Sequence, residues 1–152
     1  MKCINVRIFP MAAVTALVLG IAPTAKAQVN KGCSNASLIG TYSRTDTGYV
    51  TAPPAIAGPL AGVNTVVFDG NGGVTSAGMS SLNGTVSSGT SKGTYTVNAD
   101  CTGTTTTESN TGRTSTGFFV IADNGNEMHM VVTSPNTVIN CFFRKLYPGR
   151  VI

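Results

Sequence analysis

The chain has 152 residues, a formal net charge of +4, and 18 glycines but no tryptophan. Three of its ten basic residues precede Gln28, and the seven basic and six acidic residues from there on leave a net charge of +1. A length within about 100 to 200 residues predicts one folded domain. So small a charge, with basic residues gathered only near the C-terminus, argues against electrostatic binding of nucleic acid.

The first 27 residues have the pattern of an export signal. Lys2 and Arg7 supply a basic start, residues 11–22 form a short apolar run, and 25–27 (Ala-Lys-Ala) match the small-x-small pattern of a cleavage site. A membrane anchor is the alternative, but the apolar run is too short to span a bilayer as a helix. We therefore predict that residues 1–27 are a cleaved signal peptide. The mature protein is expected to be secreted or periplasmic, without stable membrane insertion.

Three cysteines follow this segment, and an oxidising compartment favours one disulfide among them. Cys33 and Cys101 each stand at the start of a strand-like run beside polar turn residues. We predict that these two are paired, although three cysteines permit three pairings. Cys141 is then a free thiol that we expect to be a buried small hydrophobe, because no basic neighbour or helix N-terminus lowers its pKa.

From Gly40 onward, short runs rich in Val, Ile, Thr, Tyr and Phe alternate with Gly, Asn, Asp and Ser, which is typical of strands joined by tight turns. The predicted strands are 40–47, 63–69, 73–82, 91–98, 102–108, 115–122, 127–133 and 137–144. Connections as short as Asn83-Gly84 join neighbouring antiparallel strands. The sequence therefore predicts an all-β fold, an eight-stranded antiparallel up-and-down barrel in residues 28–146 with a tail at 147–152.

Residues 47–62 interrupt this pattern because they contain three prolines among several Ala and Gly residues. We predict a long loop that cannot pair as a central strand. It either folds over one end of the barrel as a lid, with Ile56 and Leu60 as apolar contacts, or forms a mobile surface connection.

Alternation within 127–133 places Met128, Met130 and Val132 on one face, which we expect to be the core. Residues 117–122 and 139–143 are apolar on both faces. Strands of this kind need cover on both sides, from the loop, the tail or a second subunit. A homo-oligomer is therefore predicted as one possibility.

Three segments carry a resemblance to known proteins: 68–74 (FDGNGGV), 93–104 (GTYTVNADCTGT) and 119–127 (FVIADNGNE). In them the chain resembles a group of small exported bacterial proteins of unassigned role. These are similar in strand pattern to allene oxide cyclase-like and lipocalin-like (calycin-type) barrels. The resemblance spans residues 33–144 and implies the fold. Allene oxide cyclases rearrange a fatty-acid epoxide without a cofactor, but none of their catalytic positions is matched here, so activity is not implied.

The chemistry-bearing residues are few. His129 is the single histidine and no Cys or His spacing resembles a zinc motif, so we expect no metal and no cofactor. No Gly-x-Ser-x-Gly elbow is present for a serine nucleophile. The glycine-rich 69–73 joins two strands and is predicted to be a hairpin turn, because no helix follows it to hold a phosphate.

Polar residues within the predicted strands are Tyr42, Arg44, Tyr95, Glu108, Glu127 and His129, most of which we expect to face solvent. Glu127 and His129 are weak catalytic candidates, since an inward carboxylate would have a raised pKa and could act as a general acid or base. The alternative is a solvent-facing Glu127. The residues expected to line a ligand site are Phe68, Tyr95, Phe119, Met128, Met130 and Phe142.

These features favour a barrel that binds a small apolar or amphipathic ligand in its interior. Two alternatives stay open: a cofactor-free isomerase or cyclase of the allene oxide cyclase-like type, and a structural or interaction protein of the cell exterior with a filled barrel. A cavity separates the first two from the third. An inward carboxylate or histidine separates the second from the first.

Overall fold

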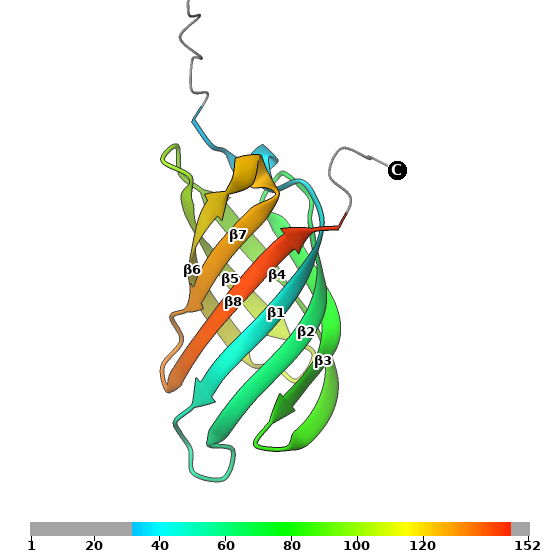
Figure 1. Cartoon of the computed structure of the whole chain (residues 1–152), viewed down its shortest axis with the longest axis vertical. Coiled ribbons are helices and arrows are strands. Elements are labelled where there is room, and N and C mark those ends of the chain that lie inside the picture. Colours follow the sequence, from blue (N-terminus) through cyan, green and yellow to red (C-terminus); the bar gives the residue numbers. More distant parts are fainter. Residues whose placement is uncertain (1–31, 147–152) are drawn as a thin grey trace, which may run out of the picture. The chain divides into compact units, whose positions relative to one another are not determined.

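The computed structural model describes residues 32–146, so the predicted signal peptide 1–27 and the tail 147–152 lie outside the described residues. Eight antiparallel strands close into one barrel, in which each strand pairs with its sequence neighbours and the last pairs with the first (Figure 1). The prediction of an all-β eight-stranded up-and-down barrel is confirmed. The strands are β1 (Gly40–Val50), β2 (Gly58–Phe68), β3 (Gly73–Leu82), β4 (Thr85–Val97), β5 (Thr102–Ser109), β6 (Thr114–Ala122), β7 (Glu127–Val132) and β8 (Thr137–Lys145).

Two short 3-10 helices, η1 (Asn35–Leu38) and η2 (Asp123–Gly125), lie together at one end of the barrel, which we call the capped end. Leu38 of η1 is fully buried. The hydroxyl of Tyr42 donates to the carbonyl of Gly125 at 2.5 Å, and the hydroxyl of Tyr95 donates to the carbonyl of Asn35 at 3.0 Å. Both helices are therefore tied to side chains that rise from the barrel wall.

Beneath the cap, aromatic rings fill the barrel. Phe68 packs edge to face against Tyr42 and Tyr95, with ring centroids 5.4 and 5.0 Å apart. Phe119 occupies the space beside Gly103, where an added Cβ would lie 2.3 Å from the Phe119 ring. Edge-to-face pairs at these distances are a favourable aromatic geometry. This half of the barrel is accordingly a packed core.

Turn chemistry sets the ends of several strands. Asn83 and Gly84 join β3 to β4 with φ angles of 49° and 82°, the conformation of a two-residue hairpin turn that the sequence predicted. The predicted strand 91–98 begins earlier in the structure, at Thr85. Residues 85–90 pair with β3 but are exposed on both faces. Because neither face is buried, they carry no apolar alternation from which the sequence could identify a strand.

The long loop predicted at 47–62 is wrong. β1 continues to Val50 and β2 begins at Gly58, which leaves only 51–57 as a loop. Pro59 is tolerated because it lies just outside the ladder of β2 and β3, whose end pair is Leu60 with Leu82, so its missing N–H removes no bond of that ladder. Its carbonyl still accepts a hydrogen bond from the backbone N–H of Asn83 in the turn after β3.

The disulfide prediction is confirmed: Cys33 is bonded to Cys101, with the two Cα atoms 4.9 Å apart. The backbone N–H of Cys33 also donates to the carbonyl of Ala99. These contacts fix the segment before η1 to the turn between β4 and β5. Cys141 is a free, buried cysteine, as predicted. No helix within residues 32–146 has the length and apolar character needed to cross a bilayer.

Candidate functional site

The half of the barrel farther from the capped end encloses a cavity of about 470 Å³. Its roof lies against the packed core of the capped end and is apolar. The roof residues are Val66, Phe68, Val74, Phe119, Met128 and Phe143. At the opposite end the lining continues through the connecting loops, with Ala52, Arg113 and Pro135.

The two sides of the cavity differ in chemistry. Strands β3 to β6 contribute a hydroxyl wall of Ser76, Ser80, Ser91, Thr105, Thr107, Ser109 and Ser115. Strands β7 and β8 contribute a mainly apolar wall of Met130, Val132, Ile139 and Cys141, with Thr137 at the end of β8 next to the connecting loop. Each set follows the two-residue repeat of a strand, in which alternate side chains point inward. The cavity is therefore amphipathic across its width.

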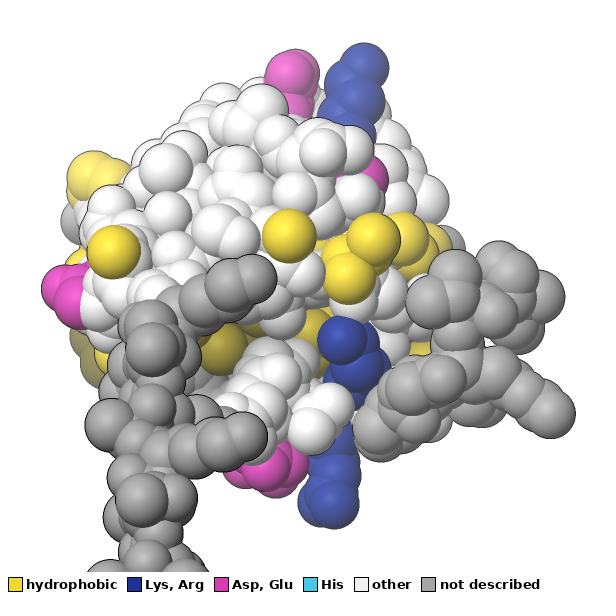
Figure 2. Space-filling model, turned by 90° about the horizontal axis from the view of Figure 1, so that it is seen from above, with side chains coloured by type: hydrophobic (Ala, Val, Ile, Leu, Met, Phe, Trp, Pro, Cys, Tyr) yellow, Lys and Arg dark blue, Asp and Glu magenta, His cyan; other side chains and the backbone are white. Residues whose placement is uncertain are grey.

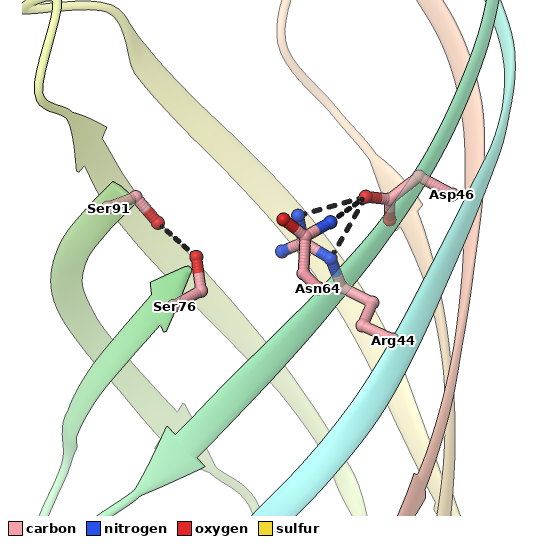
Figure 3. Close-up of polar contacts among 5 residues, drawn as sticks. All are labelled: Arg44, Asp46, Asn64, Ser76 and Ser91. Atoms are coloured by element: carbon pink, nitrogen blue, oxygen red, sulfur yellow. Dashed lines mark hydrogen bonds and ion pairs between the residues drawn. The ribbon is translucent and has the colours of Figure 1, made fainter. Parts of the chain in front are cut away.

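Between the two walls, β1 and β2 place a charged cluster inside the barrel (Figure 3). The guanidinium of Arg44 donates a hydrogen bond from Nε to Asp46 Oδ2 at 3.1 Å, and its Nη2 forms an ion pair with the same oxygen at 2.9 Å. The amide of Asn64 donates to the same oxygen at 2.9 Å. One carboxylate oxygen thus accepts two hydrogen bonds and lies in one further ion-pair contact, and Asp46 is only 7% exposed.

The strand register explains why these three residues meet. Arg44 and Asp46 are two positions apart on β1, so both point inward, and Asn64 lies opposite Arg44 on β2. The guanidinium also lies over the ring of Phe143, 5.8 Å from its centroid. This contact is a cation–π geometry, and it fixes the side chain of Arg44 against the roof of the cavity.

The second oxygen of Asp46, Oδ1, is buried and has no hydrogen-bond partner within residues 32–146. Cys141 lies opposite Asp46 on β8. Burial raises the pKa of the Cys141 thiol far above its usual value, and the neighbouring Asp46 carboxylate raises it further. The thiol is therefore protonated at neutral pH and is not a nucleophile.

A pair of hydroxyls faces this cluster across the cavity. Ser76 Oγ and Ser91 Oγ are 2.7 Å apart and share a hydrogen bond, because the two residues are directly opposed on β3 and β4. Figure 3 shows the pair on one side and the Arg44, Asp46 and Asn64 side chains on the other. Polar groups therefore approach the cavity from two separate parts of the wall.

Of the six residues expected to line a ligand site, Phe68, Phe119, Met128 and Met130 lie on the cavity wall. Tyr95 is buried within the cap and does not reach the cavity. Phe142 points outward, is 37% exposed and packs against His129 with ring centroids 5.1 Å apart. Its placement in the lining is wrong because the inward positions of β8 are Cys141 and Phe143 on either side of it.

The two weak catalytic candidates also lie outside the cavity. Met128 points inward, so its neighbours Glu127 and His129 point to the outer face. The inward carboxylate is Asp46, which sequence reasoning missed. Tyr42 and Arg44, expected with most of the polar set to face solvent, are also inward. The signal available in the sequence was their spacing, since Tyr42, Arg44 and Asp46 fall at alternate positions of one strand.

The outer face of β6 to β8 carries an exposed apolar group of Phe118, Val120, Val131 and Phe142. These residues occupy neighbouring register positions. This surface is available for contact between copies of the chain in the predicted homo-oligomer. The homo-oligomer itself stays a prediction. Seen from above (Figure 2), the described surface consists mostly of backbone and of side chains that are neither hydrophobic nor charged, with some hydrophobic side chains exposed between them and charged side chains of both signs scattered over it.

No protein-family model, curated protein or solved structure matches this chain. The resemblance to allene oxide cyclase-like and lipocalin-like barrels therefore stays a prediction. Among residues 32–146, no three His, Cys, Asp or Glu side chains gather closely enough to hold a metal ion.

Proposed function

We propose that this protein binds a small amphipathic molecule inside its barrel. The observation that carries the proposal is the cavity of about 470 Å³, a size within the range of about 300–1,000 Å³ typical of ligand pockets. Its aromatic roof and apolar wall suit a hydrocarbon or ring, while the hydroxyl wall and the Arg44–Asp46–Asn64 cluster suit a polar group. A filled structural barrel is disfavoured, because side chains leave this volume empty.

We place this activity in the secreted or periplasmic space. A disulfide between Cys33 and Cys101 is typical of an oxidising compartment. The export pattern of residues 1–27 agrees with this location. The ligand would then be a molecule that the protein meets outside the cytoplasm.

The first test is native mass spectrometry of the mature protein purified from the periplasm, before and after mild denaturation. A released lipid or metabolite would support binding and identify its class. A second test is titration with the neutral fluorescent probe N-phenyl-1-naphthylamine. We expect saturable binding with enhanced fluorescence, as the probe enters an apolar site.

A matched pair of variants separates the interior from the surface. Thr107 lines the cavity and Thr106 is exposed on the outer face of the same strand. Thr107→Phe is expected to weaken probe binding at least about tenfold, a change of about 1.4 kcal/mol, because the ring occupies the cavity. Thr106→Phe is expected to leave binding unchanged. Equal effects of the two substitutions, or no probe binding by the wild type, would refute interior binding.

A second candidate function is a cofactor-free isomerase or cyclase, and the inward carboxylate of Asp46 beside Arg44 is the observation that favours it. A carboxylate held inside a cavity can transfer a proton to or from a bound molecule. The test is conversion of the released ligand by sub-stoichiometric protein. Turnover above one equivalent that is lost in Asp46→Asn supports this function, and recovery of unchanged ligand excludes it.

A further inference from the structure

The charges that line the cavity limit which polar group it accepts. Among residues 32–146, three charged side chains reach the lining: Arg44, Asp46 and Arg113. The charge of Arg44 is compensated by Asp46, whose Oδ2 lies 2.9 Å from Nη2. Arg113 is exposed, in the connection that follows β5, where water and salt screen its charge. The centre of the cavity therefore offers no uncompensated positive charge.

The cluster nevertheless presents two unused polar atoms. Nη1 of Arg44 and Oδ1 of Asn64 take no part in the hydrogen bonds to Asp46, and no other protein partner for them lies in the described part of the chain. Figure 3 shows both atoms on the side of the cluster that faces Ser76 and Ser91. One is a donor and the other is an acceptor.

We propose that this arrangement selects an amphiphile with a neutral polar end, a hydroxyl or an amide, and rejects a carboxylate. The inference rests on the proposed function of the cavity and names its ligand class. A hydroxyl or amide can accept from Arg44 Nη1 and donate to Asn64 Oδ1 at the same time. The hydroxyls of Ser76 and Ser91 can serve as either donor or acceptor toward the same group.

A carboxylate meets the opposite conditions. It can only accept hydrogen bonds, so it would lie unpaired against the amide oxygen of Asn64 and close to the like charge of Asp46. To use the full charge of Arg44 it would have to displace Asp46. That residue is 7% exposed, and burying its carboxylate without a partner is strongly unfavourable.

The cavity also limits the size of the ligand. At about 30 Å³ for each water-sized group, a volume of about 470 Å³ corresponds to about 16 such groups. Covalently bonded atoms need less room than separate water molecules, so the probe N-phenyl-1-naphthylamine, with about 17 non-hydrogen atoms, also fits. A ten-carbon chain with one polar end is within this limit. Its chain would lie against the apolar wall and the roof, and its polar end would reach the Arg44–Asp46–Asn64 cluster.

The test compares 1-decanol with decanoate as competitors of N-phenyl-1-naphthylamine, at about pH 8, where a carboxylic acid is fully ionised. We expect decanol to bind at least about tenfold more tightly than decanoate, which corresponds to about 1.4 kcal/mol. If the probe binds but decanoate competes as well as decanol, the selectivity is refuted while interior binding stands. If the probe and both competitors fail to bind, the proposed function itself is refuted.

Asp46→Asn tests the cause of the selectivity. It keeps the shape of the side chain and leaves the charge of Arg44 uncompensated, so decanoate affinity is expected to rise at least about tenfold relative to decanol. The control Asp123→Asn makes the same change of charge at an exposed position and should leave the ratio unchanged. Circular dichroism verifies that each variant is folded, and if Asp46→Asn does not fold, the wild-type ratio decides.

Arg113→Gln addresses the remaining route for an anion. If decanoate binds wild type as tightly as decanol and loses affinity in Arg113→Gln, anions are held at the cavity mouth and the inference is overturned. If the decanol preference is the same in wild type and Arg113→Gln, the cluster of Arg44, Asp46 and Asn64 is its source.

Discussion

Tyr42 joins the barrel wall to the cap, and its hydroxyl is expected to make the stability of the protein fall as the pH becomes alkaline. The side chain is fully buried, and its hydroxyl donates to the carbonyl of Gly125. Burial, with a smaller contribution from Tyr95, raises the pKa of Tyr42 from 10.0 to about 12. The folded protein therefore holds this proton at pH values where the unfolded chain has released it.

The sign and size of the effect follow from proton linkage. Below pH 10 both states are protonated and the full contribution of Tyr42 is present. Between about pH 10 and 12 the unfolded state binds fewer protons, so the free energy of unfolding falls by about 1.4 kcal/mol per pH unit. For a pKa of about 12, the loss reaches about 2.7 kcal/mol.

Tyr42→Phe removes both the hydrogen bond and the titrating group. Near neutral pH the variant should be less stable by about 1–3 kcal/mol, because the carbonyl of Gly125 loses its donor in a buried site. It should lack the alkaline loss that Tyr42 causes. The difference in stability between wild type and Tyr42→Phe is therefore expected to narrow as pH rises from about 10 to 12.

Urea unfolding at a series of pH values measures this difference, and tyrosinate absorbance of the folded protein gives an independent titration. Tyr49→Phe is the control, since Tyr49 is 48% exposed and its substitution should leave the stability near neutral pH unchanged. A difference between wild type and Tyr42→Phe that stays constant from about pH 8 to 12 would refute the reasoning.

Three further predictions concern the scaffold. Replacing both Cys33 and Cys101 by Ser should lower the free energy of unfolding by about 4 kcal/mol, from the loop-entropy relation and a sequence separation of 68; an unchanged denaturation midpoint would contradict it. Phe119→Ala should lower the free energy of unfolding by about 3–5 kcal/mol, because it is a large-to-small change in the core. Phe142→Ala, on the outer face, should lower it by less than about 1 kcal/mol. Similar values for the two variants would show that the inward and outward faces are misassigned. Gly103→Ala should cost about 1–3 kcal/mol, because its Cβ would lie 2.3 Å from the carbonyl oxygen of Thr96. In Gly89→Ala the added Cβ would meet only Asn110 Oδ1, at a van der Waals distance of 3.7 Å, so this change should be nearly neutral; thermal unfolding of the pair decides.

Turn residues made the fold readable from the sequence. Gly, Asn, Asp and Ser at the strand ends have strong local preferences that do not depend on the rest of the protein. They marked eight segments, and short connections between eight strands leave few topologies besides a closed meander. The limits of β1 and β2 were missed because tolerance of Pro59 depends on where the neighbouring strand ends, which is a property of the assembled sheet.

The interior of the cavity was harder to predict. Alternation divides β1 into two faces but does not say which face is inward, and a charged pair argues for the solvent side because Arg and Asp are rarely buried. Arg44 and Asp46 are inward because each compensates the other and Asn64 adds a third partner. Compensation between strands cannot be read from the residues of one strand.

The pairing of β1 with β8 has a consequence for how the chain reaches its native state. Tyr42 and Lys145 are partners across this seam, so the sheet is closed only when nearly the whole chain is present. Contacts of such sequence separation slow folding relative to proteins with local contacts. Until the seam forms, β1 and β8 are open sheet edges that can pair with other chains. The barrel is thus vulnerable to aggregation through these edges while it folds. Once it has folded, the pairing of β1 with β8 protects it.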